Sequence, residues 1–109
     1  MADIQEHKAT VAKYVKNLNT AALDGLAKNY ALVLSNKDSQ YVAATDESER
    51  ITVRENFLKK KLGLTNPDAE LDAAVEAVGA VLKDEHFKSR LAYYYILAEK
   101  YNKLDLFIK

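Results

Sequence analysis

The stretch FKSRLAYYYILAEKY (residues 87–101) decides the fold, because it is apolar around most of its circumference when it is drawn as a helix. One face is formed by residues at helical spacing, which are Phe87, Leu91, Tyr94, Tyr95 and Ala98. Tyr93 and Leu97 make this face wider. Such a helix lies at the centre of a domain or is covered by a partner. We therefore predict a central or interfacial helix here, with Ser89 as an alternative, capped start.

Four further helices are predicted before this one, over about residues 3–18, 20–35, 46–62 and 67–83. Their apolar residues recur every three or four positions, and only three glycines and one proline interrupt the chain. Gly25 and Gly79 lie inside these helices and are expected at close contacts. No segment alternates long enough to indicate a strand, and the apolar tail after residue 103 is expected to pack back on the helices. The sequence thus predicts an all-α fold, with residues 1–109 as a single domain that forms a small bundle of four to five helices.

Local signals mark the ends of the third and fourth helices. Asp46 is a predicted N-cap, and Glu49 follows three residues later, as in a capping box. Gly63 comes after the third helix, where a positive φ is favoured, and Pro67 is expected at the first position of the fourth. The predicted buried side of the third helix consists of Ile51, Phe57, Leu58 and Leu62.

Composition narrows the classes of function. Sixteen basic and sixteen acidic side chains balance among 109 residues, which disfavours nucleic acid as a partner because phosphate neutralisation supplies most of that affinity. The absence of cysteine excludes disulfides, zinc–thiolate sites and thiol nucleophiles. No stretch approaches the ~20 apolar residues that a membrane span needs. We therefore expect a cytoplasmic protein with no membrane contact.

Residues with catalytic chemistry are sparse. His7 lies on the apolar side of the first helix, where a hydrogen-bonded structural histidine is the ordinary explanation, and His86 lies in a connection. The chain has no Gly-rich phosphate loop and no Gly-flanked serine. We predict no catalytic, cofactor-binding or metal-binding residue, and no cofactor. A deep polar pocket that gathers a histidine and several acids would contradict this view.

The basic residues allow two interpretations. The run Lys59–Lys61 ends a predicted helix, where cations interact favourably with exposed carbonyls. Alternatively, some basic residues form one patch that binds an anionic ligand. This requires the third helix to lie beside the start of the fifth. The residues of this patch would be Arg50, Arg54, Lys59, Lys60, Lys88 and Arg90. Residues 57–75 have the spacing of a helix-turn-helix, but the second helix would present four carboxylates to DNA, which makes nucleic acid an unlikely ligand.

Three consecutive tyrosines form the most unusual local feature. Successive helical residues are about 100° apart, so at least one tyrosine is expected at the surface or in an interface. Tyrosine is also enriched at protein interfaces. The candidate interface residues are Tyr93, Tyr94, Tyr95 and, from the tail, Phe107. The alternatives are a plain core with hydroxyls at its boundary, or stacking on bases.

Several segments together resemble a known family. They are Thr52–Arg54, Lys59–Leu64, Glu70–Ala74, Lys88–Arg90 and Tyr93–Ala98. In order and spacing they are similar to the small bacterial family called the domain of unknown function numbered 2853, most clearly from about Thr52 to Glu99. The resemblance implies a short, predominantly helical protein, and it implies no catalytic residue. A basic residue that the pattern has just before Lys88 is replaced here by Glu85, His86 and Phe87.

The leading functional expectation is a small, non-enzymatic interaction or accessory protein. Its expected partner is a second copy of itself, in a weak homodimer through the fifth helix and the tail, or an unknown protein. The second hypothesis is the binder of nucleic acid or another anionic ligand described above. An enzyme that uses His7 or His86 ranks last.

Overall fold

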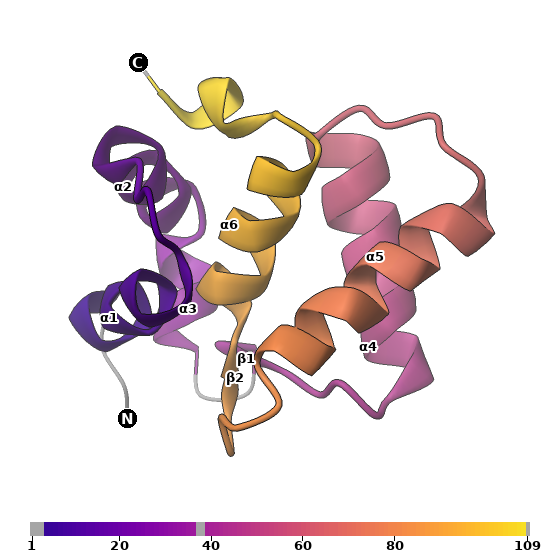
Figure 1. Cartoon of the computed structure of the whole chain (residues 1–109), viewed down its shortest axis with the longest axis horizontal. Helices are drawn as coiled ribbons and strands as arrows, with labels where there is room; N and C mark the ends of the chain where they lie inside the picture. Colours follow the sequence, from indigo (N-terminus) through magenta and orange to yellow (C-terminus); the bar gives the residue numbers. More distant parts are fainter. Residues whose placement is uncertain (1–3, 37–38, 109) are drawn as a thin grey trace.

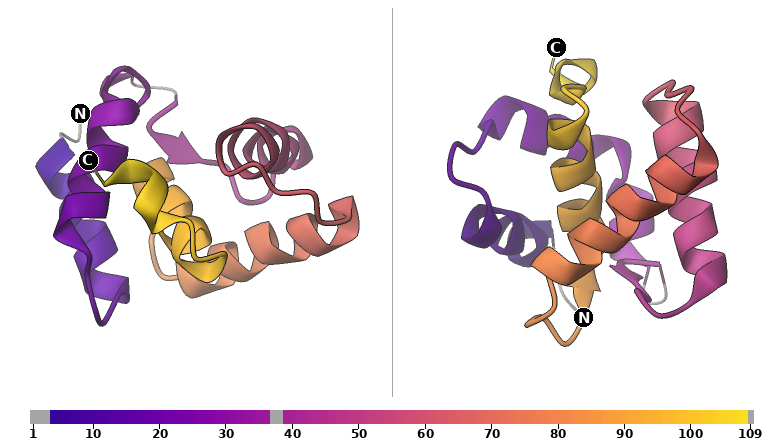
Figure 2. Two further views of the ribbon diagram at one scale, coloured as in Figure 1. Left: turned by 90° about the horizontal axis from the view of Figure 1, so that it is seen from above. Right: turned by 45° about the vertical axis from the view of Figure 1, so that its right-hand side comes forward.

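Helix α6 (Arg90–Lys100) runs through the middle of the molecule in the computed structural model (Figure 1). The structure describes residues 4–36 and 39–108. One side of α6 is covered by α1 (Ile4–Tyr14), α2 (Thr20–Asn29) and α3 (Ala31–Ser35), and the other side by α5 (Asp68–Val81) (Figures 1 and 2). The predicted central helix is therefore confirmed, and its partners are helices of the same chain.

The third predicted helix is present as two consecutive segments, α4 (Glu47–Thr52) and the π-helical η1 (Val53–Lys61). In η1 the hydrogen bonds span five residues, and the amide of Leu62 continues this pattern by donating to Phe57 O at 2.9 Å. Val53 is buried where the π-helical segment begins, whereas Ile51 is 37% exposed, so the predicted burial of Ile51 is wrong. Phe57, Leu58 and Leu62 are buried as expected.

Most helix ends follow the predicted signals. Asp46 caps α4 by accepting from Ser48 N at 2.9 Å, and Ser89 caps α6 by accepting from Ala92 N at 3.3 Å. Gly63 has the expected positive φ of 70°. Pro67 stands one position earlier than predicted, because its ψ of 147° makes it the last residue before α5.

The second predicted helix is broken. Tyr30 has φ −112° and ψ 19°, which separates α2 from α3. At this bend the Tyr30 ring meets the ring of Tyr94 edge-on at 4.9 Å and that of Phe57 at 6.0 Å. The first helix ends at Tyr14, earlier than predicted, and its predicted start at Asp3 lies outside the described residues. Contacts with the aromatic core thus override the helical pattern of this part of the sequence.

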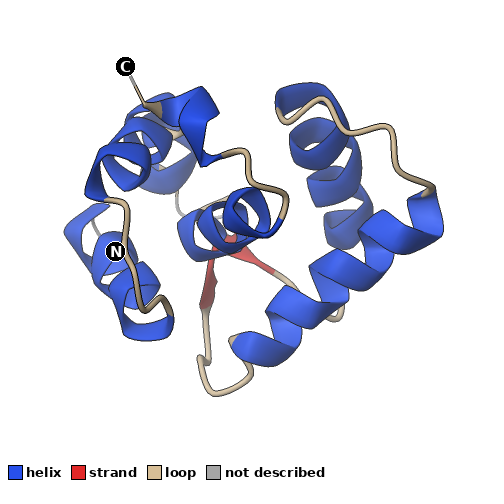
Figure 3. Ribbon diagram, turned by 45° about the horizontal axis from the view of Figure 1, so that its top comes forward, coloured by secondary structure: helices blue, strands red, loops and turns tan. Residues whose placement is uncertain are grey.

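Two short strands connect distant parts of the chain. Strand β1 (Tyr41–Val42) pairs antiparallel with β2 (Lys88–Ser89), with Tyr41 opposite Ser89 and Val42 opposite Lys88 (Figure 3). The sequence did not predict them, because two residues are too few to show an alternating pattern. The ladder fixes the point at which α6 begins.

The tail folds back on the helices as predicted. The 3₁₀ segment η2 (Leu104–Phe107) packs on α2 at Gly25. A Cβ at Gly25 would lie 1.8 Å from Phe107 O, so the contact requires a glycine. Phe107 is 2% exposed and its ring stacks near that of Phe57, with centroids 6.3 Å apart. The fold is all-α, as expected, because the two-residue ladder is the only sheet in the described part of the chain.

Candidate functional site

The predicted tyrosine interface lies in the core. Tyr93, Tyr94, Tyr95 and Phe107 are 1%, 5%, 0% and 2% exposed, so none of them offers a contact surface to a partner. Other parts of the same chain cover all three consecutive tyrosines. The Tyr94 ring stacks on Phe57 at 3.9 Å, and the Tyr95 hydroxyl accepts from the amide of Asn19 at 2.8 Å. The interface prediction is therefore wrong at these four residues.

The predicted basic patch is not formed either, because its members bind acceptors of the same chain. Arg54 donates to Glu55 at 2.7 Å and to Asp72 at 2.9 Å. Lys59 lies 2.8 Å from Glu55 and 2.6 Å from Asp68. The hydrogen bond to Asp68 is the main reason that the pKa of Lys59 is raised. Positive and negative side chains therefore alternate on this part of the surface.

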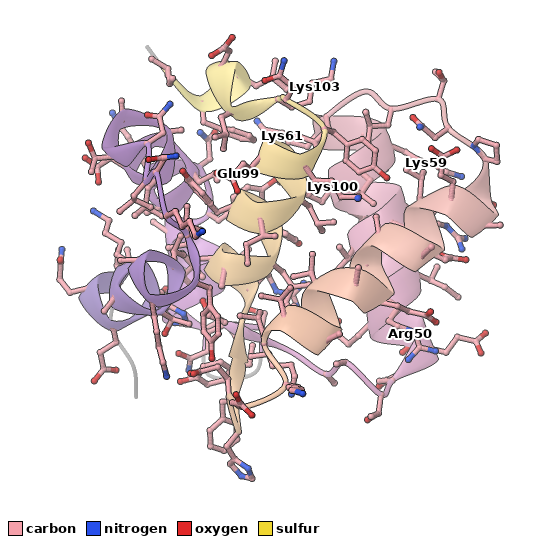
Figure 4. All side chains as sticks on the ribbon, in the orientation of Figure 1. Arg50, Lys59, Lys61, Glu99, Lys100 and Lys103 are labelled. Carbon is pink, nitrogen blue, oxygen red and sulfur yellow. The ribbon has the colours of Figure 1, made fainter. Side chains whose placement is uncertain are left out.

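The other members of the patch are separated. Arg50 and Lys59 lie near opposite ends of the α4–η1 helix (Figure 4). Arg50 donates to a backbone carbonyl before α4 at 2.8 Å, and Lys88 donates to a carbonyl three residues earlier at 3.2 Å. Lys60 is exposed. The six residues do not share one surface, and the predicted anion site is wrong as a single patch.

Arg90, the last member, is part of the core. It is 5% exposed, and its Nη2 lies 2.8 Å from Glu49 Oε1. Its guanidinium also donates to the hydroxyl of Tyr94 at 3.2 Å and to the carbonyls of Ser39 and Tyr41. Arg90 therefore joins α6 to α4 and to β1. Glu49, predicted to complete a capping box, uses its carboxylate in this ion pair instead.

His7 belongs to a second buried polar cluster. His7 is 1% exposed, with Nδ1 2.7 Å from Ser89 Oγ and Nε2 3.1 Å from Gln40 Oε1. Gln40 and Ser89 are each 2% exposed. The cluster links α1 to the residue before β1, to β2 and, through the Ser89 cap, to the first turn of α6. A structural, hydrogen-bonded histidine is what the sequence predicted here.

A pocket of about 300 Å³ opens directly above this cluster. Its lining consists of Glu6, His7, Thr10, Tyr41, Glu85, His86, Phe87 and Ser89. It thus gathers two histidines and two carboxylates, the combination that the sequence analysis named as contrary to a purely structural role. Its residues come from α1, from β1 and from the connection between α5 and α6.

Most polar groups of the pocket are already bonded within the chain. Both ring nitrogens of His7 are hydrogen-bonded, and Ser89 Oγ also caps α6. The carboxylate of Glu85 accepts from Lys13 and from the Tyr14 hydroxyl, each at 2.7 Å. These bonds, led by that of Lys13, hold the pKa of Glu85 below its usual value, and Glu85 in turn raises the pKa of both donors.

Aromatic rings form the accessible rim of the pocket. Phe87 is 62% exposed, and its ring centroid lies 5.2 Å from that of Tyr41 and 4.5 Å from that of His86. The exposed position of Phe87 at the rim was not predicted, because the helical pattern placed Phe87 on the buried face of the last helix. The signal was present in Ser89: as an N-cap it puts Phe87 two residues before the cap, outside the helix.

Two structural features bear on cofactors and membranes. Among residues 4–36 and 39–108, no group of three or more histidine or carboxylate side chains is placed to hold a metal ion. None of the helices described has the length and apolar character that a bilayer crossing needs.

The comparison with known proteins agrees with the resemblance in the sequence. No curated protein matches the chain. A family model described as "protein of unknown function (DUF2853)" matches residues 6–105, nearly the whole chain. The chain therefore belongs to the DUF2853 family.

Proposed function

We propose that this protein is a small, non-enzymatic interaction protein that binds a partner protein through the pocket rimmed by Phe87. One observation carries the proposal: a large aromatic side chain stands 62% exposed at the mouth of a pocket, beside Tyr41. Exposed aromatic residues next to a depression are typical anchors of protein interfaces.

The hydrogen bonds of His7 and Glu85 argue against a catalytic role for these two residues and support binding. A general base needs a nitrogen or oxygen within reach of a substrate proton. Both nitrogens of His7 are held by buried partners, and Glu85 is held by Lys13 and Tyr14. We propose that this polar floor supports the aromatic rim and takes no part in a reaction. We also propose that the protein acts in the cytoplasm, for which the absence of cysteine is supporting evidence.

Position-selective photo-crosslinking tests the proposal. A photoreactive phenylalanine analogue replaces Phe87 in one version of the full chain and Leu32 in the control. Leu32 is a matched control because it is 87% exposed on α3 and does not line the pocket. We expect a crosslinked adduct from position 87 and none from position 32. Excess unmodified protein should compete for the partner and suppress this adduct. Excess Phe87→Ala protein should not suppress it.

Two results would refute the proposal. One is the same set of adducts from both positions, and the other is equal competition by the Phe87→Ala protein. An adduct of twice the chain mass would identify the partner as a second copy of the chain, and light scattering across concentration would then show the dimer.

A further inference from the structure

The chemistry of the pocket points to the kind of side chain that it accepts. The lining residues include the two carboxylates of Glu6 and Glu85, and neither lysine nor arginine is among them. Tyr41 and Phe87 add two aromatic rings. Carboxylates and the faces of aromatic rings both attract cations. An anionic group would meet repulsion from both.

The protein already holds one ammonium group at the edge of this pocket. Lys13 Nζ lies 2.7 Å from Glu85 Oε2 and 5.5 Å from the centre of the Tyr14 ring. Its side chain is 63% exposed, whereas that of Glu85 is only 19% exposed. Because the Lys13 side of the pair is exposed to solvent, another cation can exchange with Lys13 at the Glu85 carboxylate. Lys13 thus shows that one carboxylate lining the pocket pairs with an ammonium group.

We propose that the pocket receives a single lysine or arginine side chain from an extended segment of the partner protein. This inference rests on the proposed function, since it specifies what enters the Phe87 pocket. The volume of about 300 Å³ is at the lower limit for ligand pockets, which suits one side chain and excludes a whole secondary-structure element. The cation lies against the rings of Phe87 and Tyr41 and near the carboxylates, and the rest of the segment contacts the exposed part of Phe87.

A titration followed by NMR tests this inference on the full, isotopically labelled chain. The probes are two blocked pentapeptides of glycine with a central arginine or a central citrulline, which has nearly the same shape without the charge. We expect the arginine peptide to shift the amide signals of the pocket residues and to bind about tenfold more tightly than the citrulline peptide. Its affinity should fall as salt is added.

Variants locate the binding. Phe87→Ala is expected to weaken the arginine peptide about two- to fivefold, and Glu6→Gln by a similar factor. The matched controls are Leu32→Ala, for an exposed apolar residue, and Glu99→Gln, for an exposed carboxylate on α6 (Figure 4). Both controls should bind like the unchanged protein.

The outcomes separate this inference from the proposed function. Equal binding of the two peptides at the pocket would refute the preference for a cation, while the pocket would remain a docking site. Shifts spread over other surfaces, or equal losses in the controls, would also refute it. Free arginine binding as tightly as the peptide would show that the site takes a small molecule and would overturn the assignment to a protein segment. Failure of the crosslinking experiment would instead remove the docking site itself.

Discussion

Replacing Gly25 by alanine should destabilise the protein, although the same change in an ordinary helix is stabilising. Alanine is favoured over glycine inside a helix by about 1 kcal/mol. A Cβ at this position, however, would lie 1.8 Å from Phe107 O, which no side-chain rotation relieves because the clashing atom is backbone. The tail must therefore leave α2.

The cost follows from what the tail buries. Phe107 is 2% exposed, and a fully buried phenylalanine contributes about 1.5–3 kcal/mol relative to an exposed one. Subtracting the helix-propensity gain leaves a net loss of about 0.5–2 kcal/mol for Gly25→Ala. Urea unfolding followed by circular dichroism measures this difference.

Two further variants complete this test. Ala77→Gly, at an exposed position inside α5, measures the propensity difference alone and should cost about 1 kcal/mol. In a Phe107→Ala background the tail is already loosened, so Gly25→Ala should cost less than it does in the unchanged protein. The reasoning is refuted if Gly25→Ala stabilises the protein by as much as Ala77→Gly destabilises it.

Three other predictions concern polar groups that are bonded within the chain. Arg90→Met should cost about 3 kcal/mol in urea unfolding, because it removes the buried cation and leaves the Glu49 carboxylate and two backbone carbonyls without this donor, whereas Glu49→Gln should cost less since an amide oxygen still accepts; equal costs would contradict this. His7→Leu should lower the unfolding free energy by about 2 kcal/mol, as measured by calorimetry, because its serine and glutamine partners lose their hydrogen bonds; an unchanged value would show that the cluster is not stabilising. The folded pKa of Glu85 is below its ordinary value of 4.5, so its contribution is present above that pH and is lost as the pH falls through the folded pKa. Stability in Glu85→Gln or Lys13→Met should therefore depend less on pH in this acid range, and an unchanged dependence would argue against the ion pair.

Sequence patterns predicted the helices well and the partners of individual side chains poorly. The signals at Asp46, Gly63 and Ser89 act within one turn, and the structure uses all three. The roles of Glu49 and Arg90 depend on each other across 41 residues, a relation that no local pattern contains.

The same limit explains the errors about the site. A wide apolar face correctly predicts that α6 is covered, but it does not distinguish a partner from the chain's own helices. The sequence allowed the basic residues to form one anion-binding surface. In the structure, however, Arg54 and Lys59 form ion pairs with carboxylates of another helix. Phe87 became accessible only because the helix starts three residues after it.

The central position of α6 has a consequence for how the protein is made. Helices α1, α2 and α5 all pack against a segment that the ribosome adds after residue 89. Until that segment is synthesised, the parts of their apolar faces that pack on α6 stay uncovered, and His7 lacks its hydrogen-bond partner Ser89, which lies 82 residues further along the chain. The nascent chain therefore exposes apolar surface during most of its translation. Chains in this state aggregate or bind chaperones. The core can form only in a late step, after α6 has been synthesised.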